Sequence, residues 1–335
     1  MEALRVRWGV LGCSAIAERR ALPALHQIDG SVVAGFASRS TATAERFAAE
    51  HGGTAMSYQQ LVESPDVDAV YLSLPNSLHF EWAKRALQAG KHVLCEKPMT
   101  VSAEQTGELV ALAAERELVL RENFAFLHHP QHEVVRELVE RGRLGRLRTF
   151  SSAFGVPPPR AGDIRYDPAL GAGCLLDVGV YPIRAAQLML GEGLTVAGAT
   201  LRVDSGTGVD VAGHALLVSE NGVFADLEFG FQHSYRSRYA LWGDAAHLSL
   251  ERAFTPPAEH RPQLRLDEQD HAEEFTLDAS HQFRDSLASF AAAVRDGRRA
   301  EIERSWLRGA RETARLVEAV QQTAVRVKQR GAIPS

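Results

Sequence analysis

The chain has 335 residues, of which 45% are hydrophobic and 24% are charged, as in ordinary globular proteins and unlike disordered, collagenous or coiled-coil ones. At about 150 residues per domain, this length indicates two domains or one large one. The net charge of −5 argues against nucleic-acid binding, which usually needs a basic face.

The sequence shows no motif for metal binding, secretion or membrane insertion. The three cysteines form no zinc-type cluster and are too few for a disulfide framework, so we expect a cytoplasmic protein without a bound metal. Apolar runs are short and interrupted by charges, and the N-terminus has no apolar h-region. We therefore expect neither membrane association nor a secretory signal.

The first 125 residues alternate short apolar runs with helical patterns. The runs cover 6–11, 32–37, 69–74, 92–95 and 118–120, and helical patterns include 42–51, 78–89 and 103–117. Near-continuous apolar runs are typical of strands buried on both faces. Their alternation with helices predicts right-handed βαβ units, so we expect an α/β domain with a parallel sheet over residues 1–125.

The pattern changes in the remainder, residues 126–335. Strands are expected at 147–154, 195–203, 213–219, 223–229 and 239–250, and helices at 131–140, 180–190, 281–295 and 306–327. Turns such as Asn221-Gly222 favour antiparallel pairing. This predicts an α+β domain whose sheet is covered by helices on one face, and the uncovered face predicts a homo-oligomer.

The turn after the first strand has the spacing of a dinucleotide-binding fingerprint. The three positions of G-x-G-x-x-G fall at Gly12, Ser14 and Ala17. Ser14 replaces the glycine that lets the backbone approach a pyrophosphate, but it keeps an N–H and adds a hydroxyl. Because a helix N-terminus at this place binds anions, we interpret the N-terminal domain as a Rossmann domain. The alternative is an ordinary strand–turn–helix.

The second strand ends without the acidic residue that would accept a hydrogen bond from the ribose 2′-OH of NAD. Ser38 and Arg39 stand there instead and offer hydrogen-bond donors. A guanidinium pairs well with a 2′-phosphate, so we expect NADP(H) as the cofactor. The alternative is a solvated loop arginine.

Two further strand ends carry candidate site residues. Lys97 ends the fourth run, in the crevice where doubly wound folds bind ligands, and could face a substrate oxygen. The third run ends in Leu74-Pro75-Asn76, with His79 one helical turn later, and we expect these residues beside the nicotinamide. For either motif taken alone, a surface lysine or a capping asparagine would be the favoured interpretation.

In the second domain, Asp177 and Tyr181 are four residues apart and share a face if the stretch is helical. A lysine lowers the pKa of a neighbouring phenol, so Tyr181 with Lys97 is a plausible acid system. The alternative for Tyr181 is a packed aromatic residue, and for Asp177 a hydrogen-bonding residue on a helix face.

These motifs together resemble the Gfo/Idh/MocA family of NAD(P)-dependent sugar oxidoreductases. The carrying segments are GCSAIA at 12–17, DVDAVY at 66–71, AGKHVLCEKP at 89–98 and GCLLDVGVY at 173–181. The resemblance implies a Rossmann domain followed by a domain with a large, mostly antiparallel open sheet, which commonly forms the oligomer interface, here of a homodimer or homotetramer.

Further segments, at 122–132, 162–166, 254–257 and 269–272, are similar to NDP-hexose 3-ketoreductases of deoxysugar biosynthesis. This implies NADPH-dependent reduction at C3 of a dTDP-3,4-diketo-2,6-dideoxyhexose, with Tyr181 as proton donor, Lys97 as its partner and Asp177 orienting the site. Implied cofactor contacts are Gly12, Cys13, Ser14, Ala15, Ile16, Ser38, Arg39, Leu74, Pro75, Asn76, His79, Glu96, Lys97, Asn123 and Arg165. Implied substrate contacts are Lys97, His128, Arg165, Tyr166, Asp177 and Tyr181.

Two other functions fit the same residues. One is a reductase of free sugars or diols, similar to glucose–fructose oxidoreductase or dihydrodiol dehydrogenase. The other is a catalytically silent dinucleotide sensor that acts through a protein partner. Sensing alone requires neither Lys97 nor Tyr181, which argues against the sensor.

Overall fold

The computed structural model describes residues 5–295 and 300–328. Residues 1–4, where we expect no signal peptide, lie outside this part. By internal packing the chain forms two units, residues 1–128 with 282–311 and residues 129–281 with 312–335. The sequence-based boundary at residue 125 assigned 282–311 to the second domain, whereas apolar side chains of this segment pack into the core of the first unit.

The first unit contains a parallel six-stranded sheet in the order β3-β2-β1-β4-β5-β6. This confirms the predicted doubly wound α/β architecture. The strands are β1 Val6–Leu11, β2 Ser31–Ala37, β3 Thr54–Met56, β4 Ala69–Leu72, β5 His92–Glu96 and β6 Leu120–Asn123. The short edge strand β3 was not predicted, because three partly exposed residues carry no periodic signal.

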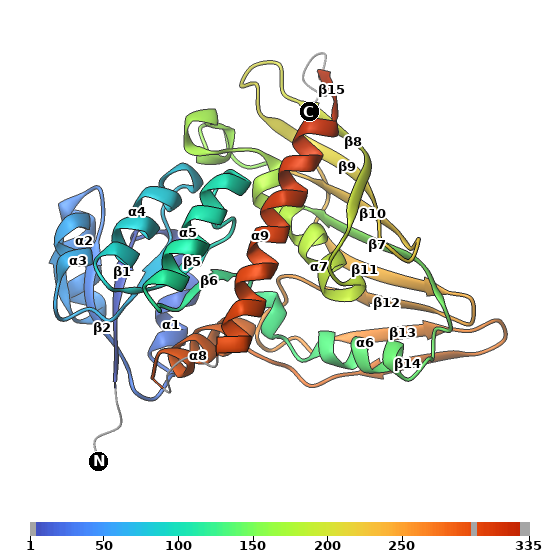
Figure 1. Ribbon diagram of the computed structural model, residues 1–335, viewed down its shortest axis with the longest axis horizontal. Helices are drawn as coiled ribbons and strands as arrows, with labels where there is room; N and C mark the ends of the chain where they lie inside the picture. The colour runs from blue at the N-terminus through green and yellow to red at the C-terminus, as the bar shows by residue number, and fades with distance from the viewer. Residues whose placement is uncertain (1–4, 296–299, 329–335) are drawn as a thin grey trace. The chain divides into compact units, whose positions relative to one another are not determined.

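Helices cover both faces of this sheet (Figure 1). Helices α3 Tyr58–Glu63, α4 Asn76–Gln88 and α5 Ala103–Glu115 contribute to one apolar cluster. Helices α1 Leu22–Leu25, α2 Thr41–His51 and α8 Gln282–Arg295 contribute to the other. Strand β1 alternates between the two clusters, since Trp8 and Val10 belong to the second and Leu11 to the first. Such double coverage explains why its sequence reads as a continuous apolar run.

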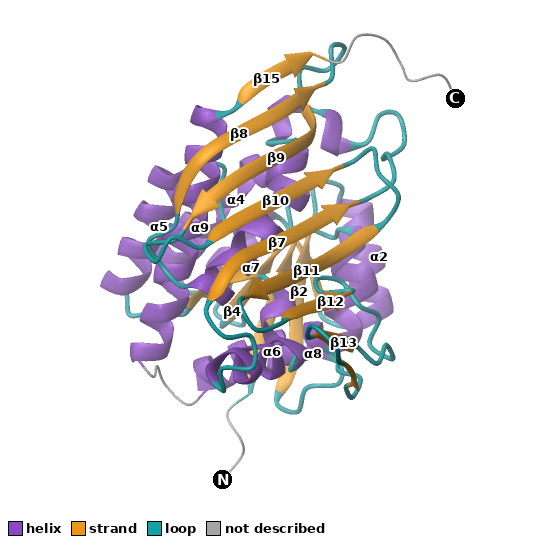
Figure 2. Ribbon diagram, turned by 90° about the vertical axis from the view of Figure 1, so that its right-hand side faces the viewer, coloured by secondary structure: helices purple, strands orange, loops and turns teal. Residues whose placement is uncertain are grey.

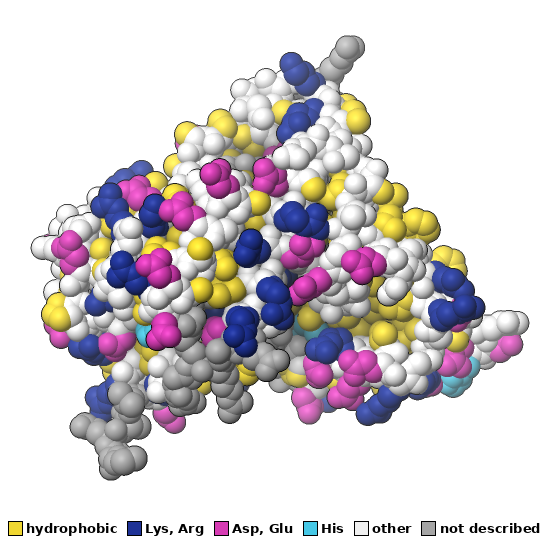
Figure 3. Space-filling model, viewed as in Figure 1, with side chains coloured by type: hydrophobic (Ala, Val, Ile, Leu, Met, Phe, Trp, Pro, Cys, Tyr) yellow, Lys and Arg dark blue, Asp and Glu magenta, His cyan; other side chains and the backbone are white. Residues whose placement is uncertain are grey.

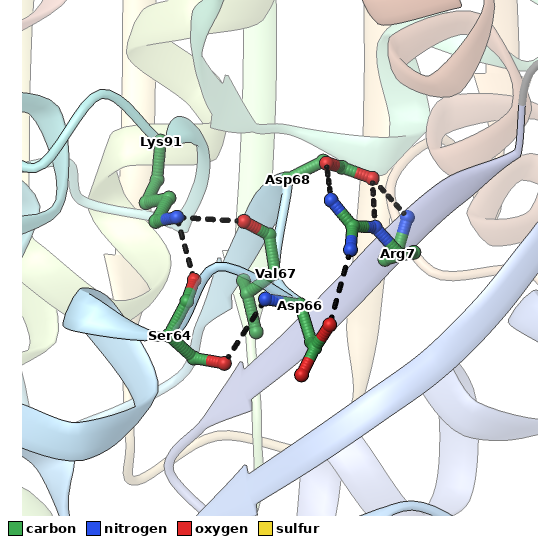
Figure 4. A network of polar contacts seen from close by, with 6 residues as sticks. All are labelled: Arg7, Ser64, Asp66, Val67, Asp68 and Lys91. Carbon is green, nitrogen blue, oxygen red and sulfur yellow. Dashed lines mark hydrogen bonds and ion pairs between the residues drawn. The ribbon is translucent and has the colours of Figure 1, made fainter.

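Hydrogen bonds from two charged side chains, Arg7 and Lys91, stabilise the amino-terminal ends of the central strands (Figure 4). Arg7 at the start of β1 donates to both carboxylate oxygens of Asp68, from Nη2 at 2.7 Å and from Nε at 3.0 Å. The Lys91 ammonium donates to the carbonyls of Ser64 and Val67 at 2.7 and 2.8 Å. The opposite, carboxyl-terminal ends of the strands remain for the candidate site.

A buried ion pair joins strand β6 to helix α9 (Ala300–Thr323), the first part of which belongs to this unit. Arg121 donates from Nε to Glu303 at 3.1 Å, and the two side chains are only 4% and 3% exposed. Arg121 also donates to Ser289 at 3.0 Å and lies over the ring of Trp306. The pair therefore fixes the C-terminal segment against the sheet.

The second unit contains a nine-stranded sheet in the order β14-β13-β12-β11-β7-β10-β9-β8-β15. Only the β7–β10 and β8–β15 pairs are parallel, so the predicted mostly antiparallel sheet is confirmed. The strands are β7 Leu147–Gly155, β8 Thr195–Val203, β9 Asp210–Val218, β10 Phe224–Gly230, β11 Arg236–Gly243, β12 His247–Glu251, β13 Gln263–Asp267, β14 Ala272–Thr276 and β15 Val325–Lys328.

Two predicted elements of this unit differ from the structure. The strand expected at 239–250 is a hairpin of β11 and β12, because the chain turns after Gly243. The helix expected through residue 327 ends at Thr323, and the β-branched Val325 and Val327 then pair with the edge of β8. The helices α6 Gln131–Glu140 and α7 Val180–Leu190 match their predicted ranges.

Helix α7 packs against β7 and β10 on one face of this sheet. Figure 2 shows the other face, where strands β8, β9, β10 and β7 lie in front of that helix. The helical stretch Pro168–Leu190 is long and apolar enough to span a membrane by length and composition alone, but 61% of its apolar part is buried inside the protein. Burial of this kind is typical of a core helix.

Acidic and basic side chains are intermixed on the face shown in Figure 3 and form no continuous basic stripe there. This distribution agrees with the net charge of −5. It gives no support to nucleic-acid binding through that face.

We predict that Glu303→Gln lowers the free energy of unfolding by about 3–5 kcal/mol, because it leaves the Arg121 guanidinium buried without a counter-charge. Urea unfolding followed by tryptophan fluorescence would measure this. Glu137→Gln, which removes the exposed partner of Arg141, is the matched control and should cost less than about 1 kcal/mol. Equal small losses for the two variants would contradict the prediction.

Candidate functional site

The fingerprint turn is built around Gly12, whose φ is +106°. A Cβ at this position would lie 2.7 Å from the Ser73 carbonyl oxygen, so the turn requires glycine. The Ser14 hydroxyl accepts a hydrogen bond from the Ala17 N–H at 3.2 Å and donates to the Ser73 hydroxyl at 2.9 Å. The hydroxyl of Ser14 thus stabilises the turn, while Ala15 and Ile16 are exposed at the start of the helical turn.

The end of β2 presents an exposed Arg39 beside the half-buried Ser38. No described carboxylate forms an ion pair with Arg39, so its guanidinium can take an anion. The neighbouring Cys13 is half-buried, and burial raises the pKa of its thiol to about 11, which keeps it neutral. Tyr58, which sequence reasoning missed, is close to Arg39: burial raises its pKa, and the Arg39 backbone N–H opposes that rise.

A chain of hydrogen bonds crosses the carboxyl ends of three adjacent strands. Glu96 on β5 accepts from the Tyr71 hydroxyl of β4 and from the Asn123 amide of β6, each at 2.7 Å. The Asn123 oxygen in turn accepts from Ser286 of α8 at 2.7 Å. Burial raises the pKa of Glu96, and these donors and the Lys97 charge oppose that rise. The predicted cofactor residues Glu96 and Asn123 are therefore brought together.

His79 lies between the turn at Leu74 and the segment that begins at Pro98. Its Nδ1 is 2.8 Å from the Pro98 carbonyl oxygen and its Nε2 is 2.8 Å from that of Leu74. Burial lowers the pKa of His79. His79 is only 1% exposed. Because its ring lies between these two carbonyl groups, it links the Leu74-Pro75-Asn76 turn to the segment after Lys97. Lys97 directly follows β5, and its peptide bond to Pro98 is cis.

In the second unit, Asp177 belongs to a π-helical turn, Leu175–Gly179, which leads directly into α7. Wide turns of this kind occur often at functional sites. Arg165 donates from Nε to Asp177 at 2.7 Å and from Nη1 to Asp163 at 3.2 Å. Asp177 and Arg165, each predicted as a substrate contact, are thus bonded to one another, and two carboxylates compensate the guanidinium charge.

Tyr181, the second residue of α7, is half-buried among aromatic rings. Its ring lies edge-on to Phe154 of β7, with centroids 5.0 Å apart, and is tilted against Phe254 at 5.6 Å. Phe154 and Phe254 are at most 4% exposed. This packing fixes the direction of the Tyr181 phenol. In the sequence, Phe154 and Phe254 are recognisable only as apolar residues and not as neighbours of Tyr181.

Other predicted substrate residues lie in different surroundings. His128 stacks on Trp306 within the first unit, with centroids 5.1 Å apart, and burial lowers its pKa to about 4. This places the ring in a packing role and keeps it neutral at pH 7. Tyr166 is edge-on to Phe231 in the second unit, at 6.3 Å. Among the described residues, no group of three or more His, Cys, Asp or Glu side chains is arranged to hold a metal ion.

Comparisons with known proteins find matches for both parts of the chain. Residues 6–124 match the family described as "Oxidoreductase family, NAD-binding Rossmann fold", and residues 132–249 match "GFO/IDH/MocA C-terminal domain". The chain is 48% identical to a dTDP-3,4-didehydro-2,6-dideoxy-alpha-D-glucose 3-reductase of Actinomadura kijaniata, over 95% of this chain and 96% of that protein.

Two further relatives extend this picture. A protein with the same name from Saccharopolyspora spinosa is 48% identical over 87% of this chain and 88% of its own length. The crystal structure of KijD10, a 3-ketoreductase from Actinomadura kijaniata in complex with NADP and TDP-benzene, superposes with a TM-score of 0.94. It is 46% identical and covers 97% of this chain and 100% of its own.

Proposed function

The chain belongs to the Gfo/Idh/MocA family of oxidoreductases, and we propose that it is an NADPH-dependent 3-ketoreductase of a dTDP-3,4-diketo-2,6-dideoxyhexose in deoxysugar biosynthesis. The observation that carries the proposal is the 48% identity, over 95% of the chain, to a reductase named for this reaction. Lys97 and Tyr181, to which we assign the proton transfer, are both present.

The first unit fits a bound NADP(H). Gly12 permits the tight turn that leads into the helix start, where backbone N–H groups suit a pyrophosphate, and the unpaired Arg39 suits a 2′-phosphate. The bonded network of Glu96 and Asn123 and the buried His79 position the loops around Lys97. When bound, the cofactor supplies the hydride that C3 of the keto sugar accepts.

Proton transfer is the task of the chain's own residues. As the C3 carbonyl carbon gains the hydride, its oxygen takes up the electron pair, and the Tyr181 phenol donates a proton to that oxygen. The Lys97 ammonium stabilises the negative charge on the oxygen and favours deprotonation of the phenol. Asp177 orients this site together with Arg165, and solvent then reprotonates the Tyr181 phenolate.

We place the protein in the cytoplasm and assign it no membrane or nucleic-acid partner. The thiols of Cys13, Cys95 and Cys174 are all free, as is usual in a reducing compartment. Its substrate is a nucleotide-linked keto sugar, in line with the TDP-benzene bound to the similar KijD10.

The proposed activity is tested by NADPH oxidation with the dTDP-3,4-diketo-2,6-dideoxyhexose, generated in situ by a 2,3-dehydratase. Tyr181→Phe removes only the phenolic oxygen and keeps the ring contacts to Phe154 and Phe254. It should lower kcat by about 10²–10⁴-fold, the usual contribution of a positioned acid, with NADPH affinity unchanged.

The alternatives give different outcomes in the same assay. Turnover of free sugars or diols at low KM, with none of the dTDP sugar, would instead indicate a free-sugar or diol reductase. A relative of this kind, D-xylose 1-dehydrogenase (NADP(+)) 2 of Haloferax volcanii, is 33% identical over 89% of the chain. NADPH binding without any turnover would indicate a sensor.

Cofactor choice yields a second prediction. Arg39→Ala should weaken NADPH binding by about 1–3 kcal/mol and NADH binding much less, because only NADPH carries the phosphate that a charged hydrogen bond would reach. Fluorescence titration with each nucleotide measures this. An equal loss for the two would show that Arg39 does not contact the 2′-phosphate.

The uncovered face of the nine-stranded sheet supports a homodimer or homotetramer. Trp242, Thr149, Phe224, Val218 and Thr195 pair across β11, β7, β10, β9 and β8 and so form one row on a single face. Trp242 and Phe224 are 61% and 51% exposed, so two large apolar side chains of this row face solvent on the same side of the sheet.

We therefore expect wild-type protein to sediment as an oligomer at micromolar concentration and Trp242→Asp to shift it toward the monomer. A carboxylate in an apolar interface loses hydration without gaining a partner. Trp242→Phe keeps the apolar contact and serves as the control. A monomeric wild type would contradict this assembly.

A further inference from the structure

Tyr235 and Arg252 have no role in the reaction described above. We propose that they form the subsite for the diphosphate of the nucleotide-linked substrate, with the Arg252 guanidinium binding phosphate oxygens and Tyr235 holding that guanidinium in place. The inference rests on the proposed function and adds the residues that recognise the nucleotide part.

Tyr235 directly precedes β11 and Arg252 directly follows β12, so both lie at the same end of the second unit's strands as the end of β7, which contacts Tyr181. Strands β7 and β10 are parallel and end there, and β11 begins there. The loops that follow are tied together, since the Val156 N–H donates to the Gly230 carbonyl at 3.0 Å and the His233 N–H to the Val156 carbonyl at 3.1 Å. The carboxyl ends of β7 and β10 therefore meet one loop cluster.

A continuous series of ring contacts leads from Tyr181 to the guanidinium. Tyr181 is 5.0 Å from Phe154, and Phe154 is 6.5 Å, edge-on, from Tyr235. The guanidinium carbon of Arg252 is 5.0 Å from the Tyr235 centroid. Phe154 is buried, whereas Tyr235 is 40% exposed, so the series begins at the proposed proton donor and ends at the surface.

The loop that carries Arg252 is held rigidly. The Tyr235 hydroxyl is 2.8 Å from the Thr255 hydroxyl, and Ser237 accepts from the Ala253 and Phe254 N–H groups at 2.9 Å each. Arg252 itself has φ +54°, a conformation that non-glycine residues rarely adopt and that clusters at functional sites. These hydrogen bonds hold the backbone of Arg252 in place, and the backbone in turn sets the direction of the Arg252 side chain.

Charge distinguishes Arg252 from the other arginine near the candidate site. Arg165 is bonded to the carboxylates of Asp163 and Asp177, which already compensate its charge. No carboxylate in the described part of the chain pairs with Arg252. An exposed guanidinium stacked on an aromatic face keeps its donor fork available, and that fork matches phosphate oxygens. A diphosphate is therefore the ligand class that suits it.

The test measures binding of dTDP and turnover of the dTDP keto sugar by Arg252→Asn. Asparagine tolerates the left-handed backbone, so this variant removes the charge while preserving the fold. We expect Kd for dTDP and KM for the sugar to rise about 10–100-fold, the loss of one charged hydrogen bond or more, with kcat and NADPH affinity nearly unchanged. Arg252→Lys should recover part of the affinity.

Three further variants separate binding from folding. Tyr235→Leu should weaken dTDP binding, whereas Tyr235→Phe, which keeps the ring, should bind nearly as the wild type does. Arg141→Gln, an exposed arginine on the bend after α6, is the charge-matched control with unchanged affinity. Wild-type dTDP affinity in Arg252→Asn, with wild-type turnover intact, would overturn the subsite alone. Absence of dTDP binding and turnover in the wild type itself would overturn the proposed function as well.

Discussion

The Glu96 carboxylate organises the candidate site of the first unit, because it bonds neighbours on both sides of its strand. It accepts from Tyr71 on β4 and from Asn123 on β6, and Asn123 in turn accepts from Ser286 on α8. A carboxylate largely withdrawn from water is costly unless donors satisfy it, so the three strand ends and the helix are held in one arrangement. Because Lys97 directly follows Glu96, this network also fixes the backbone position of Lys97.

The same constraint explains why residues 282–311 pack with the Rossmann sheet. Ser286 supplies the last donor of the Glu96 network, and Glu303 neutralises Arg121, which would otherwise be a buried, unpaired charge on β6. Apolar side chains of α8 such as Phe290 complete the core around Trp8. The polar partners of Asn123 and Arg121 on β6 thus come from residues 163 and 182 positions later in the chain.

In the second unit, aromatic packing takes the place of that polar network. Tyr181 is oriented by Phe154 and Phe254, and its neighbour Asp177 is oriented by Arg165. The π-helical turn that carries Asp177 is packed closely at Gly179, where a Cβ would lie 2.9 Å from the Phe229 ring. Local backbone geometry, ring contacts and one ion pair together place the two candidate groups.

The sequence by itself determined the α/β sheet, the fingerprint turn at Gly12 and the helices α6 and α7, because apolar periodicity and turn residues are local signals. It also singled out candidate site residues, through motifs such as Glu96-Lys97-Pro98. It could not show that the Ser14 hydroxyl bonds Ser73, that His79 is enclosed by two carbonyls, or that residues 325–328 form a strand. Only the tertiary structure decided these points, because each depends on partners distant in sequence whose approach leaves no periodic pattern.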